Sequence, residues 1–352
     1  MPKTEELVTP RIAVDVMGGD FGPQVAVPGA VDAAREGIAV SLVGDETAIK
    51  AELAKLDTDG LDITVVHTTQ VVEMDDKPSD ALRRKKDSSI QVACRLVKNG
   101  EADGVVSPGN SGATVACGMF VLGRIKGVLR PALAGILPTE KNPVILIDVG
   151  ANVDSKPQHL AQFGLMADVL ARDVLGYKDP SVGILSIGEE EGKGNATVRE
   201  AFDLLRDSDL HFIGNVEGRD IYTGDVDVVV CDGFVGNVAL KLSEGLAKSM
   251  SRILKEELRS SWLSKLGTLL SLRAFRRFKK VVDYAEYGGA PLLGLKGIVI
   301  VTHGKSNELA ITNCIRMAAT SVRNRMHEHL AEGLAAHKAK ADSKAQPGKD
   351  AA

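Results

Sequence analysis

Short apolar segments rich in β-branched residues alternate with polar clusters along most of the chain. Six of them end in a group of Gly, Ser, Asn, Asp or Lys, at residues 12–16, 105–106, 144–147, 184–187, 228–230 and 298–301. Apolar runs of this length are typical of buried strands in a parallel sheet. Ligands of an open parallel sheet lie beyond the carboxyl ends of its strands, so we expect the six following loops to converge on one site.

Segments with the helical spacing of apolar residues lie between these strands. They cover residues 25–35, 88–99, 157–175, 196–206 and 238–258. Strands that alternate with helices form right-handed βαβ units, whose parallel sheet is covered on both faces. The pattern therefore predicts an α/β protein with its candidate site at the strand ends.

Residues 258–282 break this alternation with a strongly amphipathic segment. On a helical wheel, one apolar face carries Trp262, Leu263, Leu266, Leu269 and Leu270. A second apolar face carries Leu272, Phe275, Phe278 and Val282. The side opposite this second face is basic and carries Arg273, Arg276, Arg277 and Lys280. The apolar stripe changes phase near residues 270–271, which predicts two short helices joined by a turn.

This segment has two interpretations that the pattern leaves open. A strong apolar stripe, a lone tryptophan and a basic face are typical of an element that lies on a membrane surface. A helical hairpin in a dimer interface would show the same pattern. The two are compatible, since a hairpin can pack at its base and contact lipid at its tip.

These patterns divide the chain into one folded domain and two tails. We expect a flexible tail over residues 1–10 and a single α/β domain over residues 11–337. Within that domain, residues 250–283 form the helical membrane or dimer insertion. Residues 338–352 are polar, small and contain Pro and Gly, which predicts a disordered tail.

The composition is that of a globular protein. The 352 residues are 44% hydrophobic and 26% charged, and a chain of this length can bury a substantial core without disulfides or metals. The net charge of -4 gives no overall attraction for nucleic acid, so we expect no nucleic-acid partner.

The cysteines and the N-terminus indicate the compartment. Cys94, Cys117, Cys231 and Cys314 are far apart and lack metal-site spacing, which favours buried, reduced thiols. The N-terminus has no hydrophobic signal region, and no stretch reaches the ~18 apolar residues of a membrane span. We therefore expect a cytoplasmic protein that does not cross a membrane.

Several catalytic motifs fail on their spacing. Residues 188–194 superficially resemble a P-loop, but one residue is missing between the glycines, and Gly194 stands where Ser or Thr should follow the lysine. Residues 18–22 lack the G-x-G spacing of a dinucleotide fingerprint. The chain has no G-x-S-x-G elbow and no H-E-x-x-H, which disfavours a serine hydrolase and a zinc protease.

The loop over residues 107–114 is the strongest candidate for an anion site. It offers consecutive backbone amides, serine hydroxyls and an asparagine amide, and it leads into a helical segment. Its candidate ligands are Ser107, Gly109, Asn110, Ser111 and Gly112. Amides at a helix N-terminus bind phosphate, whereas a plain capped turn needs only one such polar residue. We therefore favour the anion site.

A second polar cluster covers residues 77–89. It contains four consecutive cations, Arg83, Arg84, Lys85 and Lys86, shortly before Ser88, a good helix cap. Such a run is usually a solvated helix face. Its position before a helix start also makes a surface suited to phosphate or to an acidic protein.

Further candidates lie at strand ends. Three aspartates at strand ends are candidates for a general base, a metal ligand or a cap for the next turn, and capping is the commonest of these roles. They are Asp15, Asp148 and Asp232. His303 beside Lys305 is a candidate acid–base or anion-binding pair, although a lone histidine is more often structural.

Taken together, these motifs resemble the bacterial phosphate acyltransferases of phospholipid synthesis. The likeness extends over about residues 11–335. The matching segments, in order, are residues 13–23, 77–89, 107–113, 148–152, 215–218, 231–237 and 303–304. So many separated motifs in the same order make the resemblance highly specific.

The resemblance implies a doubly wound α/β/α sandwich related to phosphotransacetylases and to isopropylmalate dehydrogenase. It implies a homodimer that attaches peripherally to the inner face of the plasma membrane. The reaction would transfer an acyl group from acyl carrier protein to inorganic phosphate, and the acyl phosphate would feed a downstream glycerol-3-phosphate acyltransferase. We expect no cofactor and assign no metal ligands.

Such chemistry requires the protein to hold a phosphate dianion in line with a thioester and to stabilise the oxyanion that develops. We expect catalytic roles for Lys193, His303 and Asp232. The expected phosphate or substrate ligands are Gly18, Gly19, Asp20, Lys77, Ser79, Ser107, Gly109, Asn110, Ser111, Gly112, Asp148, Asn152, Asn237 and Lys305. Residues 83–86 would dock the acidic carrier protein. The expected membrane contacts are Trp262, Leu263, Leu266, Leu269, Leu270, Phe275 and Phe278.

Alternative functions remain at this stage. A phosphate acetyl- or butyryltransferase that uses coenzyme A would share the fold and the chemistry. A non-enzymatic lipid-binding or scaffolding protein would need only the amphipathic segment and would leave the polar loops unexplained. A dehydrogenase of the related fold is disfavoured because the dinucleotide fingerprint is missing.

Overall fold

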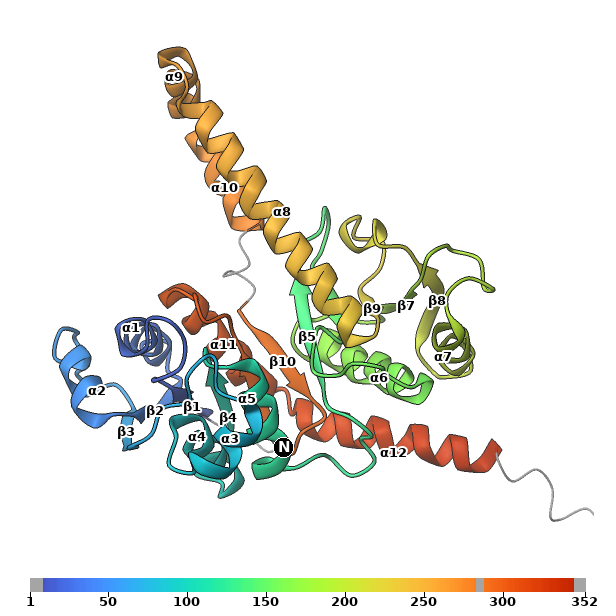
Figure 1. Ribbon diagram of the computed structural model, residues 1–352, viewed down its shortest axis with the longest axis horizontal. Coiled ribbons are helices and arrows are strands. Elements are labelled where there is room, and N and C mark those ends of the chain that lie inside the picture. Colours follow the sequence, from blue (N-terminus) through green and yellow to red (C-terminus); the bar gives the residue numbers. More distant parts are fainter. Residues whose placement is uncertain (1–8, 283–287, 345–352) are drawn as a thin grey trace, which may run out of the picture.

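The computed structural model describes residues 9–282 and 288–344, and within these ranges eleven strands form one sheet (Figure 1). The strands are β1 (Arg11–Asp15), β2 (Ala39–Gly44), β3 (Ile63–His67), β4 (Gly104–Ser107), β5 (Ala132–Leu137), β6 (Val144–Ile147), β7 (Ser181–Leu185), β8 (His211–Val216), β9 (Val228–Val230), β10 (Ala290–Leu293) and β11 (Ile298–Val301). Their order across the sheet is β3-β2-β1-β4-β11-β10-β5-β6-β9-β7-β8.

Helices connect most of these strands. They are α1 (Pro23–Ala34), α2 (Glu46–Leu53), α3 (Pro78–Arg84), α4 (Ser89–Lys98), α5 (Ser111–Cys117), η1 (Gly118–Leu122), α6 (Pro157–Asp173), α7 (Ala196–Arg206), η2 (Asp220–Tyr222), α8 (Gly233–Arg259), α9 (Trp262–Leu270), α10 (Leu272–Val282), α11 (Glu308–Arg323) and α12 (Met326–Lys344).

The sheet has a hydrophobic core on each face. Along β1, Ile12 and Val14 belong to a cluster that includes residues of α1 and α11, whereas Ala13 belongs to a second cluster that includes residues of α4. Alternate residues of one strand are thus buried on opposite faces, as in a central strand of a sheet covered on both sides. This confirms the predicted doubly wound, mostly parallel α/β architecture.

The two halves of the sheet run in opposite directions. β10 is antiparallel to both β11 and β5, and β5 is antiparallel to β6. These pairings separate the parallel strands β1, β4 and β11 from the parallel strands β6, β9 and β7. The expectation that all six loops converge at one edge is wrong, because the carboxyl ends of the two halves lie at opposite edges of the sheet.

Three helices form a projection that we call the arm. α8 leaves the body, α9 lies at the outer end, and α10 turns back toward the body (Figure 1). α9 ends at Leu270, Ser271 caps it, and α10 begins at Leu272, which confirms the turn predicted near residues 270–271. The helical segment begins at Gly233, before the expected insertion at 250–283, because α8 is continuous.

The C-terminal boundary also differs from the predicted one. α12 continues to Lys344, and Lys340 forms an ion pair with Asp209. The expected disorder therefore does not begin at residue 338, since the alanine and lysine of this stretch favour a helix. Residues 1–8 and 345–352 of the expected tails lie outside the described residues. Within residues 9–282 and 288–344, no helix has the length and apolarity that crossing a bilayer requires.

Candidate functional site

The loops after β1, β4 and β11, which we call the first loop group, pack directly on one another. The amide of Asp20 donates to the carbonyl oxygen of Gly304 at 2.8 Å. A Cβ atom at Gly18 would lie 2.7 Å from the amide nitrogen of Gly109, and Gly19 has a φ of 78°. The close approach of the loops thus accounts for these glycines, which the sequence suggested as phosphate ligands.

Ser107 holds this group together from the protein interior. Its hydroxyl donates to Asp15 Oδ2 at 2.7 Å and accepts from the Gly109 amide at 3.1 Å and the Thr114 hydroxyl at 3.3 Å. Ser107 is fully buried. Its hydroxyl is used in hydrogen bonds within the protein, so Ser107 positions the loop, and its expected role as a ligand stays a prediction.

The outer part of the same loop is exposed. The Asn110 side chain caps α5 and donates to the carbonyl oxygens of Met74 and Asp76 at 2.9 and 3.0 Å, so it is also structural. Ser111 and Gly112 follow in the first turn of α5 and are exposed. First-turn amides have no acceptor within the helix, so these two residues are the donors that the loop offers to a ligand.

The start of α3 adjoins this exposed edge. A Cβ atom at Gly112 would lie 2.9 Å from the ring of Pro78. Lys77 and Ser79 flank Pro78 and are exposed. The structure thus brings these two predicted ligands into the region of Ser111.

His303 adds an uncharged donor to the first loop group. Its Nδ1 accepts from the amide of Lys305 at 3.0 Å, so the neutral ring carries its proton on Nε2. Burial lowers the pKa of His303 below the ordinary 6.5, and the charges of Lys241 and Lys248 lower it further against the opposing effects of Glu244 and Asp20. The lowered pKa favours the neutral ring at pH 7, in which Nε2–H is the donor.

Asp15 lies beneath the first loop group, and its burial leads to a prediction about the stability of the protein. Only 2% of it is exposed, and burial raises its pKa from the ordinary 3.8, against hydrogen bonds from Ser89 and Ser107. The folded state binds this proton more tightly than the unfolded state, so stability falls as the pH rises above 3.8 through the folded pKa. Asp15→Asn should therefore raise the free energy of unfolding at pH 7 by about 1–2 kcal/mol in urea titrations.

The pH dependence separates this effect from a general gain in stability. At pH 4, Asp15→Asn should raise the free energy of unfolding by a smaller amount, because more of the wild-type Asp15 carboxyl is then protonated in both the folded and the unfolded state. The exposed Asp59 provides the control, and Asp59→Asn should change stability by less than about 0.5 kcal/mol at either pH. An Asp15→Asn protein less stable than the wild type at pH 7 would contradict this account.

The loops after β6 and β9, which we call the second loop group, are built around Asp148. Its carboxylate oxygens accept from the amides of Leu133, Gly150, Ala151 and Asn152 and from the Asn152 side chain. Asp148 is fully buried, which raises its pKa, while these donors lower it. Both carboxylate oxygens of Asp148 accept hydrogen bonds within the protein, which assigns it a structural role, and its expected role as a phosphate ligand stays a prediction.

Asp232 has a similar structural role. Its Oδ1 accepts from the amide of Phe234 at 2.9 Å, and its Oδ2 accepts from the amide of Ser155 at 2.7 Å. Asp232 therefore caps α8 and ties it to the loop after β6. These contacts show the capping role that the sequence left open for Asp232, and its expected catalytic role stays a prediction.

The expected ligands Asn152 and Asn237 also belong to the second loop group. The side chain of Asn152 donates to Asp148 and to the carbonyl oxygen of Pro131, each at 2.8 Å. A Cβ atom at Gly150 would lie 3.4 Å from Cγ of Asn237. The structure brings the two asparagines to the same loops, which lie beyond the opposite edge of the sheet from the first loop group.

Gly236 provides a sharp test of this packing. A Cβ atom there would lie 1.9 Å from the carbonyl oxygen of Asp148, whereas nothing lies within 4 Å of one at Gly245 on the same helix. Gly236→Ala should destabilise the protein by about 3 kcal/mol, and Gly245→Ala should stabilise it by about 0.5–1 kcal/mol. Thermal unfolding should show Tm shifts of opposite sign, and shifts of the same sign would contradict the observed packing.

Lys193 lies outside both loop groups. It follows β7, is exposed, and donates its amide to the carbonyl oxygen of Glu190 at 3.0 Å. Five strands separate β7 from β4 in the sheet, which corresponds to roughly 29 Å at the usual strand spacing. Lys193 thus follows a strand in the other half of the sheet from the strands that precede Ser111 and His303, and its expected catalytic role stays a prediction.

The predicted docking residues lie at the end of α3. Arg83, Arg84 and Lys86 are exposed. Lys85 is turned inward, and its ammonium group donates to the carbonyl oxygen of Val71 at 2.8 Å. The basic surface thus consists of the three exposed cations at the end of α3, the helix whose start adjoins the exposed edge of the first loop group.

The predicted membrane contacts are concentrated at the outer end of the arm. α9 contains no buried residue, and the exposed fraction is 72% for Trp262 and 81% for Leu270. The other exposed members are Leu263, Leu266, Leu269 and Phe278. Phe275 is half-buried. The arm therefore presents an apolar end far from the sheet (Figure 1).

Sequence reasoning missed the contribution of α8 to the first loop group. The charges of Lys241, Glu244 and Lys248 act on His303, which is distant from them in the sequence. Their spacing of three and four residues places them on one helical face. This regular polar stripe, opposite the apolar residues of α8, is the signal that could have identified them.

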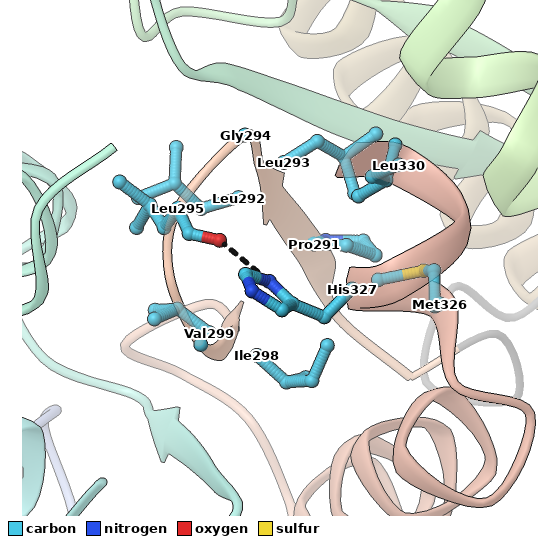
Figure 2. A pocket seen from close by; sticks show the side chains of 11 residues that line it. Pro291, Leu292, Leu293, Gly294, Leu295, Ile298, Val299, Met326, His327 and Leu330 are labelled. Atoms are coloured by element: carbon cyan, nitrogen blue, oxygen red, sulfur yellow. Dashed lines mark hydrogen bonds between the residues drawn. The ribbon is translucent and has the colours of Figure 1, made fainter. Parts of the chain in front are cut away.

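A small apolar cavity lies away from both loop groups. Figure 2 shows Leu292, Leu295 and Ile298 around it, with Nδ1 of His327 at 3.1 Å from the carbonyl oxygen of Leu295. Its volume is ≈ 10 Å³, which is about the space of one water molecule. It is therefore too small to be a substrate site.

Comparison with known proteins places the chain in a family. The model of the family described as "Fatty acid synthesis protein" matches residues 10–329. A phosphate acyltransferase of Nitratidesulfovibrio vulgaris is 64% identical over 328 residues, covering 93% of this chain and 95% of that protein. A phosphate acyltransferase of Lawsonia intracellularis is 61% identical over 326 residues, covering 92% and 94%.

Solved structures share the fold at low sequence identity. A phosphotransacetylase from Streptococcus pyogenes has a TM-score of 0.61 and 20% identity, over 89% of this chain and 94% of that chain. A phosphotransacetylase from Staphylococcus aureus has a TM-score of 0.56 and 16% identity, with the same coverage of 89% and 94%. The structures show the fold, and the close relatives show that the chain belongs to the bacterial phosphate acyltransferase family.

Proposed function

We propose that this protein transfers an acyl group from a thioester to inorganic phosphate. The observation that carries the proposal is the first loop group. There, the exposed donors of Ser111 and Gly112 adjoin a loop with neutral His303 and cationic Lys305. This combination suits a phosphate dianion and a thioester carbonyl side by side.

The proposed reaction needs no activated side-chain nucleophile. A phosphate oxygen attacks the thioester carbonyl carbon, a C–O bond forms, and the C–S bond then breaks. The carbonyl oxygen becomes negative in the intermediate, where the Nε2–H of His303 stabilises it. Lys305 and the amides of Ser111 and Gly112 hold the phosphate. The departing thiolate takes a proton from solvent.

The proposed acyl donor is a long-chain thioester of acyl carrier protein, and the proposed product serves glycerophospholipid synthesis. The match to a fatty acid synthesis family supports this choice. A basic surface at the end of α3 would attract an acidic carrier, and the start of the same helix packs against Gly112. This surface consists of Arg83, Arg84 and Lys86. A coenzyme A thioester, the donor of the alternative phosphate acetyl- or butyryltransferase, is the second candidate, and phosphotransacetylases share the fold.

Parallel assays with palmitoyl-carrier protein and palmitoyl-coenzyme A distinguish the two donors. We expect kcat/KM to be at least about tenfold higher for the carrier thioester, because an acidic protein can contact more of the basic surface than the phosphates of coenzyme A can. Arg83→Glu with Arg84→Glu should raise KM for the carrier thioester several-fold more than KM for the coenzyme A thioester. A higher kcat/KM for coenzyme A would overturn the carrier assignment.

The arm supports a further part of the proposal, a homodimer attached peripherally to the inner face of the plasma membrane. The exposed apolar end at α9 and the basic α10 suit an anionic bilayer. α8 presents a stripe of exposed apolar side chains that suits a second copy of the chain. This stripe consists of Val235, Val238, Leu242, Leu246, Met250 and Ile253. The location would let the acyl phosphate pass to a membrane-bound glycerol-3-phosphate acyltransferase.

A further inference from the structure

An exposed methionine side chain packs on the first loop group. A Cβ atom at Gly304 would lie 3.0 Å from Cε and 3.7 Å from Sδ of Met74. The end of the Met74 side chain therefore covers Gly304, which directly follows His303 in the chain. Met74 is 46% exposed, so its side chain contacts the loop and still presents apolar surface to a ligand.

Hydrogen bonds hold the backbone of Met74 in this position. The side chain of Asn110 donates to the carbonyl oxygens of Met74 and Asp76 at 2.9 and 3.0 Å. The amide of Glu73 donates to Asp76 Oδ2 at 2.8 Å, which closes the turn around Met74. The loop after β4 thus fastens the turn that carries Met74, while the unbranched thioether side chain can still change its rotamer.

A second exposed apolar side chain belongs to the same junction. Phe21 is 50% exposed and directly follows Asp20. The amide of Asp20 donates to the carbonyl oxygen of Gly304 at 2.8 Å, and Asp20 Oδ1 would lie 3.3 Å from a Cβ atom at Gly304. Isolated exposed apolar residues are ordinary on a protein surface. Here two segments that contact Gly304 each carry one, next to the proposed oxyanion donor.

The proposed reaction determines which part of the substrate lies beside His303. The acyl chain begins at the carbonyl carbon whose oxygen the Nε2–H of His303 would stabilise, so its first methylene groups must lie close to that ring. Methylene groups gain free energy when they leave water for an apolar surface. A methionine side chain can adapt its shape to such a flexible chain. An acyl chain is therefore the occupant that the chemistry and the exposed apolar side chains favour together.

We propose that Met74 and Phe21 form an acyl-binding surface, which gives this site its preference for a long-chain over a short-chain thioester. This inference rests on the proposed function, since it concerns the acyl chain of the same substrate. It gives a specificity-determining role to two apolar side chains in a region that otherwise offers polar groups and glycines.

Thioesters that differ only in their acyl chain test the proposal. The measured quantity is kcat/KM for palmitoyl-carrier protein divided by kcat/KM for acetyl-carrier protein. Met74→Gln and Phe21→Gln should each lower this ratio about fivefold, because each removes an apolar contact with the long chain. Met74→Leu keeps an apolar side chain of similar volume and should stay within about twofold of the wild type. An unchanged ratio in either glutamine variant would overturn the proposal.

Leu129 provides the matched control. It is 44% exposed, close to the 46% of Met74, and it precedes β5. β5 and β11 are both antiparallel to β10, so the start of β5 and the end of β11 lie at opposite edges of the sheet. Leu129→Gln should leave the ratio unchanged. An equal fall in Leu129→Gln and Met74→Gln would show a general effect of lost apolar surface and would overturn the proposal.

The NMR signal of the Met74 methyl group gives a readout that is independent of turnover. In phosphate-free protein labelled with ¹³C at the methionine methyl groups, Met74→Gln identifies this signal by its loss. Palmitoyl-carrier protein should shift the signal, whereas carrier protein without an acyl chain should not. The inference stands if this shift appears in a protein that makes no acyl phosphate, whereas the proposed function then fails. A signal that neither palmitoyl-carrier protein nor palmitoyl-coenzyme A shifts would overturn the inference.

Discussion

Replacement of His303 by alanine should lower kcat about 100-fold, because it removes one preorganised donor for the oxyanion. Glutamine at the same position should keep kcat within about tenfold of the wild type, since its side-chain amide can replace the Nε2–H. The expectation rests on the contact of Nδ1 with the Lys305 amide at 3.0 Å, which fixes the ring proton on Nε2. Initial rates of acyl phosphate formation at saturating phosphate measure both effects.

A general base at this position would give a different result. Glutamine cannot accept and return a proton at neutral pH, so both variants would then lose activity equally. His329 provides the control, because it is exposed and pairs with Asp173 at 2.9 Å on the surface. His329→Gln should leave kcat unchanged. Equal losses in His303→Ala and His303→Gln would contradict the role of His303 as a neutral donor.

Glutamate in place of Leu266, Leu269 and Leu270 should abolish sedimentation of the protein with vesicles that contain phosphatidylglycerol. Each leucine contributes at least about 1.5 kcal/mol when it enters an apolar phase, so the partition coefficient should fall roughly 1000-fold. All three side chains are exposed at the outer end of the arm. Turnover in solution should be unchanged, because the loop groups lie in the body (Figure 1).

A matched control separates this effect from a general loss of exposed apolar surface. Ile187 is 82% exposed, close to the 81% of Leu270, but it lies after β7 in the body. Ile187→Glu should sediment with vesicles as the wild type does. Sedimentation of the triple variant would contradict a membrane role. Loss of both sedimentation and turnover would instead indicate that the outer end of the arm contributes to the dimer interface or to the protein core.

The local patterns predicted the elements because periodicity and composition are local properties. The change of phase near Leu270 marks the turn between α9 and α10, since an apolar stripe can shift only where the helix is interrupted. The reversal of the sheet has no such signal. It results from pairings such as Leu292 with Leu133, which join segments far apart in the sequence. The sequence therefore predicted the strands and the fold class, but not that the loops divide into two groups.

The candidate site was predictable by residue type and less so by role. Serine, asparagine and aspartate were found at the strand ends, yet the same residue types bind ligands and stabilise loops. Only the contacts show that Ser107, Asn110, Asp148 and Asp232 are occupied within the protein. Lys241 was missed for a related reason. A charged residue on a helix is usually solvated, and the effect of Lys241 on the pKa of His303 depends on how α8 packs.

The central claim is that a phosphate oxygen attacks a thioester carbonyl at the first loop group. Incubation of the protein with palmitoyl-carrier protein and phosphate labelled with ¹⁸O at every oxygen tests it directly by mass spectrometry. The account predicts palmitoyl phosphate that retains all the labelled oxygens, formed about 100-fold more slowly by His303→Ala than by the wild type. Release of free palmitate without acyl phosphate, or equal rates from the two proteins, would contradict it.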